Sequence, residues 1–235
     1  SFTPRIISEI FVNLVFVLVL FDLGFSVWLQ NILTVLAVTV VILSSRFGVQ
    51  ALIFLVPVTS LITGSLDLLI LVSVGFLIPI VVSRGEVSKI YKHHISFLVE
   101  YYNKNRKGKM AVSQRNKFSN IVSYTNEKRI DLRKTIWNLI AVNSYTSVIL
   151  MMPVYVCSIV LTVKIFLLGD GFYLINIFGP VLAASIVFFL INRPNLLFLG
   201  EAERYLNHVA FFVVAAFVSL ADQTSMTWLL WLVIS

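Results

Sequence analysis

Long apolar runs separated by short polar turns make up most of this chain. They cover, in order, residues 6–21, 27–45, 49–62, 66–83, 135–168, 172–192 and 205–221. Turn-forming stretches such as "DLG", "SSRFG", "TGS" and "SRGE" close the first four runs. Runs of this kind predict membrane-crossing helices, because about 20 apolar residues span the roughly 30 Å hydrocarbon core of a bilayer.

The pattern predicts an all-α, polytopic membrane protein with about seven spans. We expect membrane hairpins with about four spans over 1–83, a basic helical cytoplasmic insert over 84–134, and further membrane helices over 135–235. Because a new apolar run begins near Met226 and the sequence ends at Ser235, we expect the chain to be a piece of a longer protein. Four prolines inside the runs are expected to kink their helices, namely Pro57, Pro79, Pro153 and Pro180.

Composition supports the membrane class. The chain is 59% hydrophobic and 12% charged, whereas an ordinary soluble domain carries about 25% charged residues. Cys157 is the only cysteine and lies in an apolar run, so no disulfide framework is expected. His93 and His94 are adjacent and would point about 100° apart on a helix, so we expect no metal site there and assign no cofactor.

Charge is distributed unevenly between the two sides of the predicted spans. Seventeen of the 18 lysines and arginines fall on one side, and Lys164 alone falls on the other. The opposite side carries four acidic residues at its turns, namely Asp22, Asp67, Asp170 and Asp222. By the positive-inside rule, the N-terminus and residues 84–134 face the cytoplasm, and a cell membrane is the expected location.

The insert over 84–134 begins as an amphipathic helix. Apolar and aromatic side chains recur along one expected stripe, formed by Val87, Tyr91, Ile95, Leu98 and Tyr102. A second stretch with Phe118, Ile121 and Val122 on one face follows a basic break. We expect the basic surface to bind anionic lipid headgroups; a soluble protein partner, an anionic substrate and simple solvation are the alternatives. No recognition motif for nucleic acid accompanies the charge, so nucleic acid is not expected as a partner.

The segment "RPNLLFLGEAERYLNH", residues 193–208, brings polar groups to the foot of an apolar run. If a helix begins near Gly200, Glu201, Arg204, Tyr205 and His208 share one face. Together with Arg193, they form a candidate substrate-binding set for a phosphate, a pyrophosphate or a sugar hydroxyl. The structural alternative is a helix foot with a dipole-matching acid and interfacial anchors, which leaves His208 unexplained.

This segment, preceded by a basic insert and apolar hairpins, resembles a segment of multi-spanning membrane proteins from bacterial surface-polysaccharide gene clusters. The resemblance implies a role in making, polymerising or moving a lipid-linked glycan, whose diphosphate would suit Arg193 and Arg204. The chain departs from a glycosyltransferase in having no nucleotide-binding motif, so no catalytic residue is assigned and enzyme activity is left open.

The leading functional hypothesis is therefore a membrane protein that handles an anionic amphiphile at its cytoplasmic face, in lipid-linked glycan or surface-polysaccharide assembly. An ion or solute channel or transporter is the first alternative, and a membrane scaffold that recruits a cytoplasmic partner is the second. The sequence contains no P-loop, no "HExxH", no "GxSxG" and no potassium-filter motif. It leaves oligomerisation open.

Overall fold

The computed structural model describes residues 3–106, 143–168, 174–193 and 195–223. Every regular element in these ranges is helical, which confirms the all-α prediction. The elements are α1 (Pro4–Leu20), α2 (Val27–Ser44), α3 (Arg46–Thr63), α4 (Leu66–Val82), α5 (Glu86–Arg106), α8 (Ser144–Met151), α9 (Pro153–Leu168), α10 (Ile175–Ile191), the 3₁₀ helix η3 (Leu197–Leu199), α11 (Glu203–Asn207) and α12 (Ala210–Gln223).

Local sequence explains where several of these helices begin and end. The Ser26 hydroxyl accepts a hydrogen bond from the Leu29 amide and caps α2, and Ser45 caps α3 in the same way through Gly48. Gly64 ends α3 in the left-handed conformation, with φ of 70°, which glycine adopts without steric cost. These caps and turns coincide with the polar breaks between the apolar runs, so the helices follow the predicted boundaries closely.

Two of the described helices, α2 and α3, are long and apolar enough to cross a membrane. Each has 18 residues, a length of about 27 Å at 1.5 Å per residue. Helices α4 and α10 and the stretch 210–219 are apolar but shorter. Large apolar side chains also cover much of the outer surface, with Trp28 80% and Leu61 83% exposed. The number of spans, about seven in the sequence prediction, stays a prediction.

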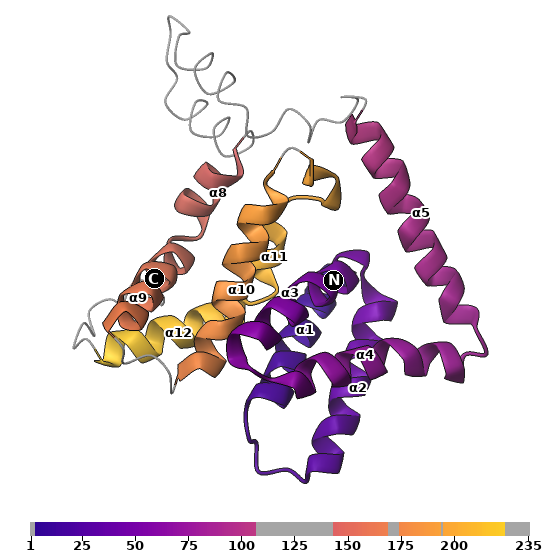
Figure 1. Cartoon of the computed structure of the whole chain (residues 1–235), viewed down its shortest axis with the longest axis horizontal. Coiled ribbons are helices and arrows are strands. Elements are labelled where there is room, and N and C mark those ends of the chain that lie inside the picture. Colours follow the sequence, from indigo (N-terminus) through magenta and orange to yellow (C-terminus); the bar gives the residue numbers. More distant parts are fainter. Residues whose placement is uncertain (1–2, 107–142, 169–173, 194, 224–235) are drawn as a thin grey trace, which may run out of the picture.

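Helix α3 lies near the centre of the described structure and packs against α1, α2, α4 and α10. Figure 1 shows α5 as an arm on one side of this group and α8 with α9 on the other. Close approach is concentrated at glycines, since a Cβ placed on Gly75 would lie 2.7 Å from Val38 and one on Gly179 would lie 2.5 Å from Thr63. Small residues at such points allow the helix backbones to approach each other.

The prediction of one long helix over 135–168 is wrong in its described part. Helix α8 ends at Met151 and α9 begins at Pro153, so the chain breaks at Met152, which has φ of −132° and ψ of 55°. The break coincides with Pro153, whose nitrogen carries no hydrogen for an intrahelical bond and whose ring clashes with the preceding turn. The other three prolines, in contrast, lie inside continuous helices, as predicted.

The predicted helix over 205–221 is also interrupted. Helix α11 ends at Asn207 and α12 begins at Ala210, with tight bonds from His208 N to Tyr205 O (3.3 Å) and from Val209 N to Leu206 O (3.2 Å) at the junction. The second amphipathic stretch of the insert, the turn at 169–171 and the run from Met226 lie outside the described residues.

Candidate functional site

Contacts between helices define two ends of the central bundle. At one end, Gly48 at the start of α3 approaches Ser8 near the start of α1, and Phe47 contacts Arg204 of α11. At the other end, the Asn176 side chain of α10 donates a hydrogen bond to Leu20 O at the end of α1 (2.8 Å).

Four arginines gather toward the first of these ends, which we call the arginine end, and they are Arg5, Arg46, Arg193 and Arg204. Arg193 is placed there because α10 begins at the opposite end and runs antiparallel to α3, with Gly179 against Thr63. Asp22 follows the end of α1, and Asp67 lies in the first turn of α4, just after α3 ends. The acidic turns therefore follow helix ends opposite the arginines, in the arrangement that the charge pattern of the sequence predicts.

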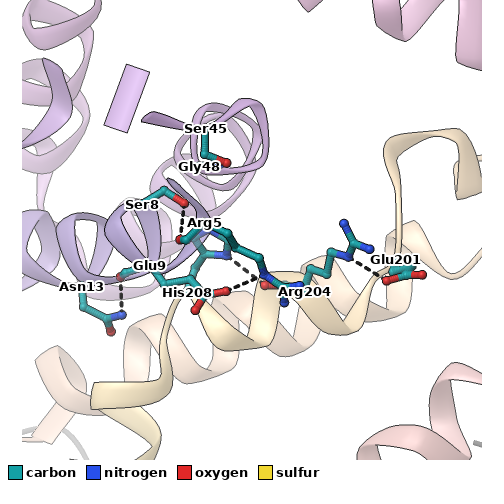
Figure 2. A network of polar contacts seen from close by, with 9 residues as sticks. All are labelled: Arg5, Ser8, Glu9, Asn13, Ser45, Gly48, Glu201, Arg204 and His208. Atoms are coloured by element: carbon teal, nitrogen blue, oxygen red, sulfur yellow. Dashed lines mark hydrogen bonds and ion pairs between the residues drawn. The ribbon is translucent and has the colours of Figure 1, made fainter. Parts of the chain in front are cut away.

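Arg204 and Glu201 form the ion pair that their spacing predicts. The Nε–H of Arg204 donates to Glu201 Oε2 at 2.7 Å, and the two side chains remain 28% and 37% exposed (Figure 2). The guanidinium carbon of Arg204 also lies 4.7 Å from the ring centroid of Phe47, at the start of α3. A cation over an aromatic face is attracted by the ring quadrupole, so Arg204 ties α11 to α3 while it stays within reach of solvent.

Tyr205 lies on the inner side of α11, 1% exposed. Its hydroxyl donates to Leu199 O at 3.2 Å and lies 3.4 Å from Gln50 Oε1 on α3. Its ring also makes an edge-to-face contact with Phe54. Tyr205 is therefore a packing residue whose hydroxyl is hydrogen-bonded, and it does not lie on an open surface.

His208 directly follows α11 and is also 1% exposed. Its Nδ1 donates to the backbone carbonyl of Arg204 at 2.8 Å, because a carbonyl can only accept. In a continuous α-helix the same carbonyl would accept from the His208 amide, whereas here that amide donates to Tyr205 O at 3.3 Å. Within the described residues Nε2 has no hydrogen-bond partner, and Figure 2 shows the side chain beside Arg5 and Glu9 of α1.

The five predicted contacts therefore do not share one open face. Glu201 and Arg204 pair at the rim, Arg193 is exposed at the end of α10, and Tyr205 and His208 are buried. The expectation of a single face assumed a helix from Gly200, whereas α11 begins at Glu203 and Gly200 has φ of 110°. The irregular backbone at Gly200 leaves Glu201 at the rim, while Tyr205 and His208 lie in the interior.

Sequence reasoning missed the inward position of His94 on α5. Val87, Tyr91 and Leu98 pack as predicted, but Ile95 is 62% exposed and His94 takes its place on the packed side. At 100° per residue, His94 lies within about 20° of Val87 while Ile95 lies about 80° away. Burial lowers the pKa of His94, and the positive charge of Arg46 and then His93 lowers it further. The predicted stripe therefore had the correct helical period, but it included the exposed Ile95 in place of His94.

Among the residues that the structure describes, no three of His, Cys, Asp and Glu come together in a group that could hold a metal ion. Comparison of the chain with protein-family models, with curated proteins and with solved structures finds no match in any of the three.

Proposed function

We propose that this protein is a multi-pass membrane protein that handles an anionic amphiphile at its arginine end, as a component of lipid-linked glycan or surface-polysaccharide assembly. In this proposal the arginine end and residues 84–134 face the cytoplasm of a bacterial cell. Arg193 and Arg204 contact the anionic group, Glu201 orients Arg204, and Tyr205 and His208 hold the backbone that carries them.

The observation that carries the proposal is the gathering of arginines at one end of a bundle with apolar sides. An amphiphile with an anionic head meets both surfaces at once, since its chain stays among apolar side chains while its head lies at the interface. Guanidinium groups suit phosphate because their planar N–H donors match two phosphate oxygens. Arg204 is the best-positioned of these groups, because Phe47 and Glu201 fix its plane before any ligand arrives.

The test is a cell-surface glycan assay on variants of Arg204 in the organism's own gene. Arg204→Gln should abolish glycan display, and Arg204→Lys should retain part of it, because lysine keeps the charge and loses the planar fork. Lys92→Gln, which removes one positive charge at an exposed position of α5, serves as the matched control. Full activity of a well-expressed Arg204→Gln protein would refute the role of this residue.

A matched pair of substitutions separates the two nitrogens of His208. The amide nitrogen of asparagine can replace Nδ1 as donor to the Arg204 carbonyl, whereas glutamine extends further and replaces Nε2 instead. Because the proposal gives His208 a positioning role through Nδ1, His208→Asn should retain more activity than His208→Gln. The reverse order would show that Nε2 acts directly on the substrate, and a thermal melt of each variant provides the structural readout.

Transport is the second candidate, and a specific observation favours it. The break between α8 and α9 lies opposite the break between α11 and α12, and a cavity of about 240 Å³ separates them. Met152 and Pro153 line one side, and Asn207 and Ala210 line the other. Discontinuous helices that face each other across a cavity are a recurring feature of transporter binding sites.

Solute flux into proteoliposomes tests the transport candidate. Ala210→Trp would fill the cavity between the two breaks and should stop flux, whereas Val218→Trp places the same side chain at an exposed position of α12 outside the cavity. Absence of flux in the native protein, together with loss of glycan display in the Arg204→Gln variant, would favour the amphiphile proposal over transport.

A further inference from the structure

Helix α5 crosses the outer side of α3 and α4 and is held at three points along its length. The Tyr91 hydroxyl donates to Phe76 O of α4 at 3.0 Å. Further along, the Arg46 guanidinium carbon lies 4.8 Å from the Phe97 ring centroid, and Tyr102 makes an edge-to-face contact with Phe198 of η3. Figure 1 shows the helix as an arm beside the central group, and these three contacts fix how it lies there.

A pocket of about 300 Å³ lies between α5 and the two helices beneath it. This volume falls at the lower end of the range of small-molecule sites, about 300–1,000 Å³. Carbon atoms form nearly all of the wall, with Val49 and Ile53 from α3, Phe76 from α4, and Ile95 and Leu98 from α5. Ile53 and Ile95 are also about half exposed, at 52% and 62%, so the pocket opens on the outer surface of the protein.

The polar groups at this pocket are basic or neutral. Arg46 is exposed and, within the described parts of the chain, forms no ion pair; its guanidinium carbon lies over the Phe97 ring. His94 reaches the pocket from α5, and its Nδ1 is buried without a hydrogen-bond partner among described residues. None of the described residues that line the pocket carries a carboxylate. The site therefore combines an apolar wall, an uncompensated cation and an unsatisfied imidazole nitrogen.

We propose that this pocket binds one long-chain phosphate ester, with the first part of its chain between Ile53 and Leu98 and its phosphate at Arg46. The phosphate would neutralise Arg46, whose guanidinium Phe97 already holds in place, and would provide an acceptor for His94 Nδ1. The apolar wall selects a lipid phosphate over free phosphate, because free phosphate cannot use that wall. This inference rests on the proposed function and adds a site separate from Arg204.

Photolabelling of the full chain in phosphatidylcholine nanodiscs tests the site. One arm contains phosphatidic acid with a diazirine in its acyl chain, and the other contains phosphatidylcholine with the same diazirine. Labelled peptides from α3 and α5 are expected in the first arm, with labelling unaffected by added inorganic phosphate. Arg46→Gln should reduce that labelling by about tenfold, the effect expected for loss of a charge-assisted hydrogen bond. Ile53→Trp, which fills the pocket at an exposed position, should reduce it as well.

Lys92→Gln is the matched control, because it removes one positive charge from the exposed side of α5 without touching the pocket. Its labelling should equal that of the native protein.

If Arg46→Gln and Ile53→Trp both retain native labelling, or if the label maps outside α3 and α5, the pocket assignment is wrong while binding of an anionic amphiphile still stands. If the native protein labels equally in both lipid arms, both the pocket and the proposed function fail. Size-exclusion profiles of both variants must match the native protein for the comparison.

Discussion

The Arg204 guanidinium lies 4.7 Å from the ring centroid of Phe47, and a Cβ on Gly200 would lie 2.7 Å from the edge of the same ring. One aromatic side chain at the start of α3 thus supports both the irregular loop after α10 and the short helix that follows it. This contact holds the start of α11 against a residue that lies more than 150 positions earlier in the sequence.

The contact between Phe47 and Arg204 should be measurable as a coupling free energy. In a double-mutant cycle of Phe47→Leu and Arg204→Met, we expect a coupling of about 1 kcal/mol, the usual size of a partly exposed cation–π contact. The measurement is the free energy of unfolding in mixed micelles. Additive effects of the two substitutions would contradict an energetic role for the contact.

Gly200→Ala should destabilise the protein more than Gly24→Ala does. Both glycines have positive φ, 110° and 71°, but nothing lies within 4 Å of a Cβ on Gly24, whereas one on Gly200 would meet Phe47. We expect a cost of about 1 kcal/mol at Gly24 from the backbone alone and about 2–4 kcal/mol at Gly200 from strain plus overlap. Thermal melts of the purified variants compare the two. Equal losses would mean that the Phe47 ring moves away freely.

The approach of α10 to α3 can be tested with a rescue experiment. Gly179→Ala should lower the free energy of unfolding by about 1–3 kcal/mol, because the new Cβ would lie 2.5 Å from the Thr63 methyl group. Thr63→Ser removes that methyl and keeps the hydroxyl, which donates to Thr59 O at 2.9 Å. The double variant should therefore recover most of the loss. A double variant as unstable as Gly179→Ala alone would show that another contact is limiting.

Protonation of His94 should loosen α5. Burial lowers the pKa of His94 in the folded protein below its ordinary value near 6.5, so the unfolded state binds the proton more strongly. The stabilising contribution is therefore complete above about pH 6.5 and is lost as the pH falls through the folded pKa. Arg46 on α3 and His93 on α5 are the groups whose positive charge acts on His94. The side chain that α4 contributes to this pocket is Phe76, which does not titrate.

Hydrogen–deuterium exchange of residues 86–106 at pH 7 and at pH 5 measures this effect once intrinsic rates are corrected. Protection should fall at the lower pH in the native protein. His94→Gln should show little change, because glutamine does not titrate. The same loss of protection in both proteins would assign the pH effect to another group.

Hydrophobic pattern predicted most of the described helices because each apolar run ends at a capping serine, a glycine or a polar turn. Ser26, Ser45 and Gly64 are examples, and their effects act within a few residues of the chain. The break at Met152 could not be predicted in this way, because proline in an apolar run can produce either a kink or a full stop. Pro57 lies inside a continuous helix, whereas a new helix begins at Pro153.

The candidate site was predictable only where its interactions are local. The Glu201–Arg204 pair follows from a spacing of three residues, and the structure confirms it. The burial of Tyr205 depends on Gln50, which lies 155 residues away in sequence. The angular distance of His94 from Val87 could have assigned it to the packed side of α5. No pattern in the sequence around Arg46, in contrast, indicates that it lies at a pocket. A lone arginine between two apolar runs looks the same whether it is solvated or lies at a pocket.

The two breaks that line one cavity in this protein differ in their local chemistry. At Met152 the next residue is a proline, whose nitrogen has no hydrogen to donate to a carbonyl of the preceding turn, so a continuous helix there would lack one backbone bond. The junction after Asn207 contains no proline, and its His208 and Val209 amides donate to carbonyls three residues back rather than four. Only a change of hydrogen-bond partners therefore separates α11 and α12 from one continuous helix, so this junction can straighten without any change in sequence.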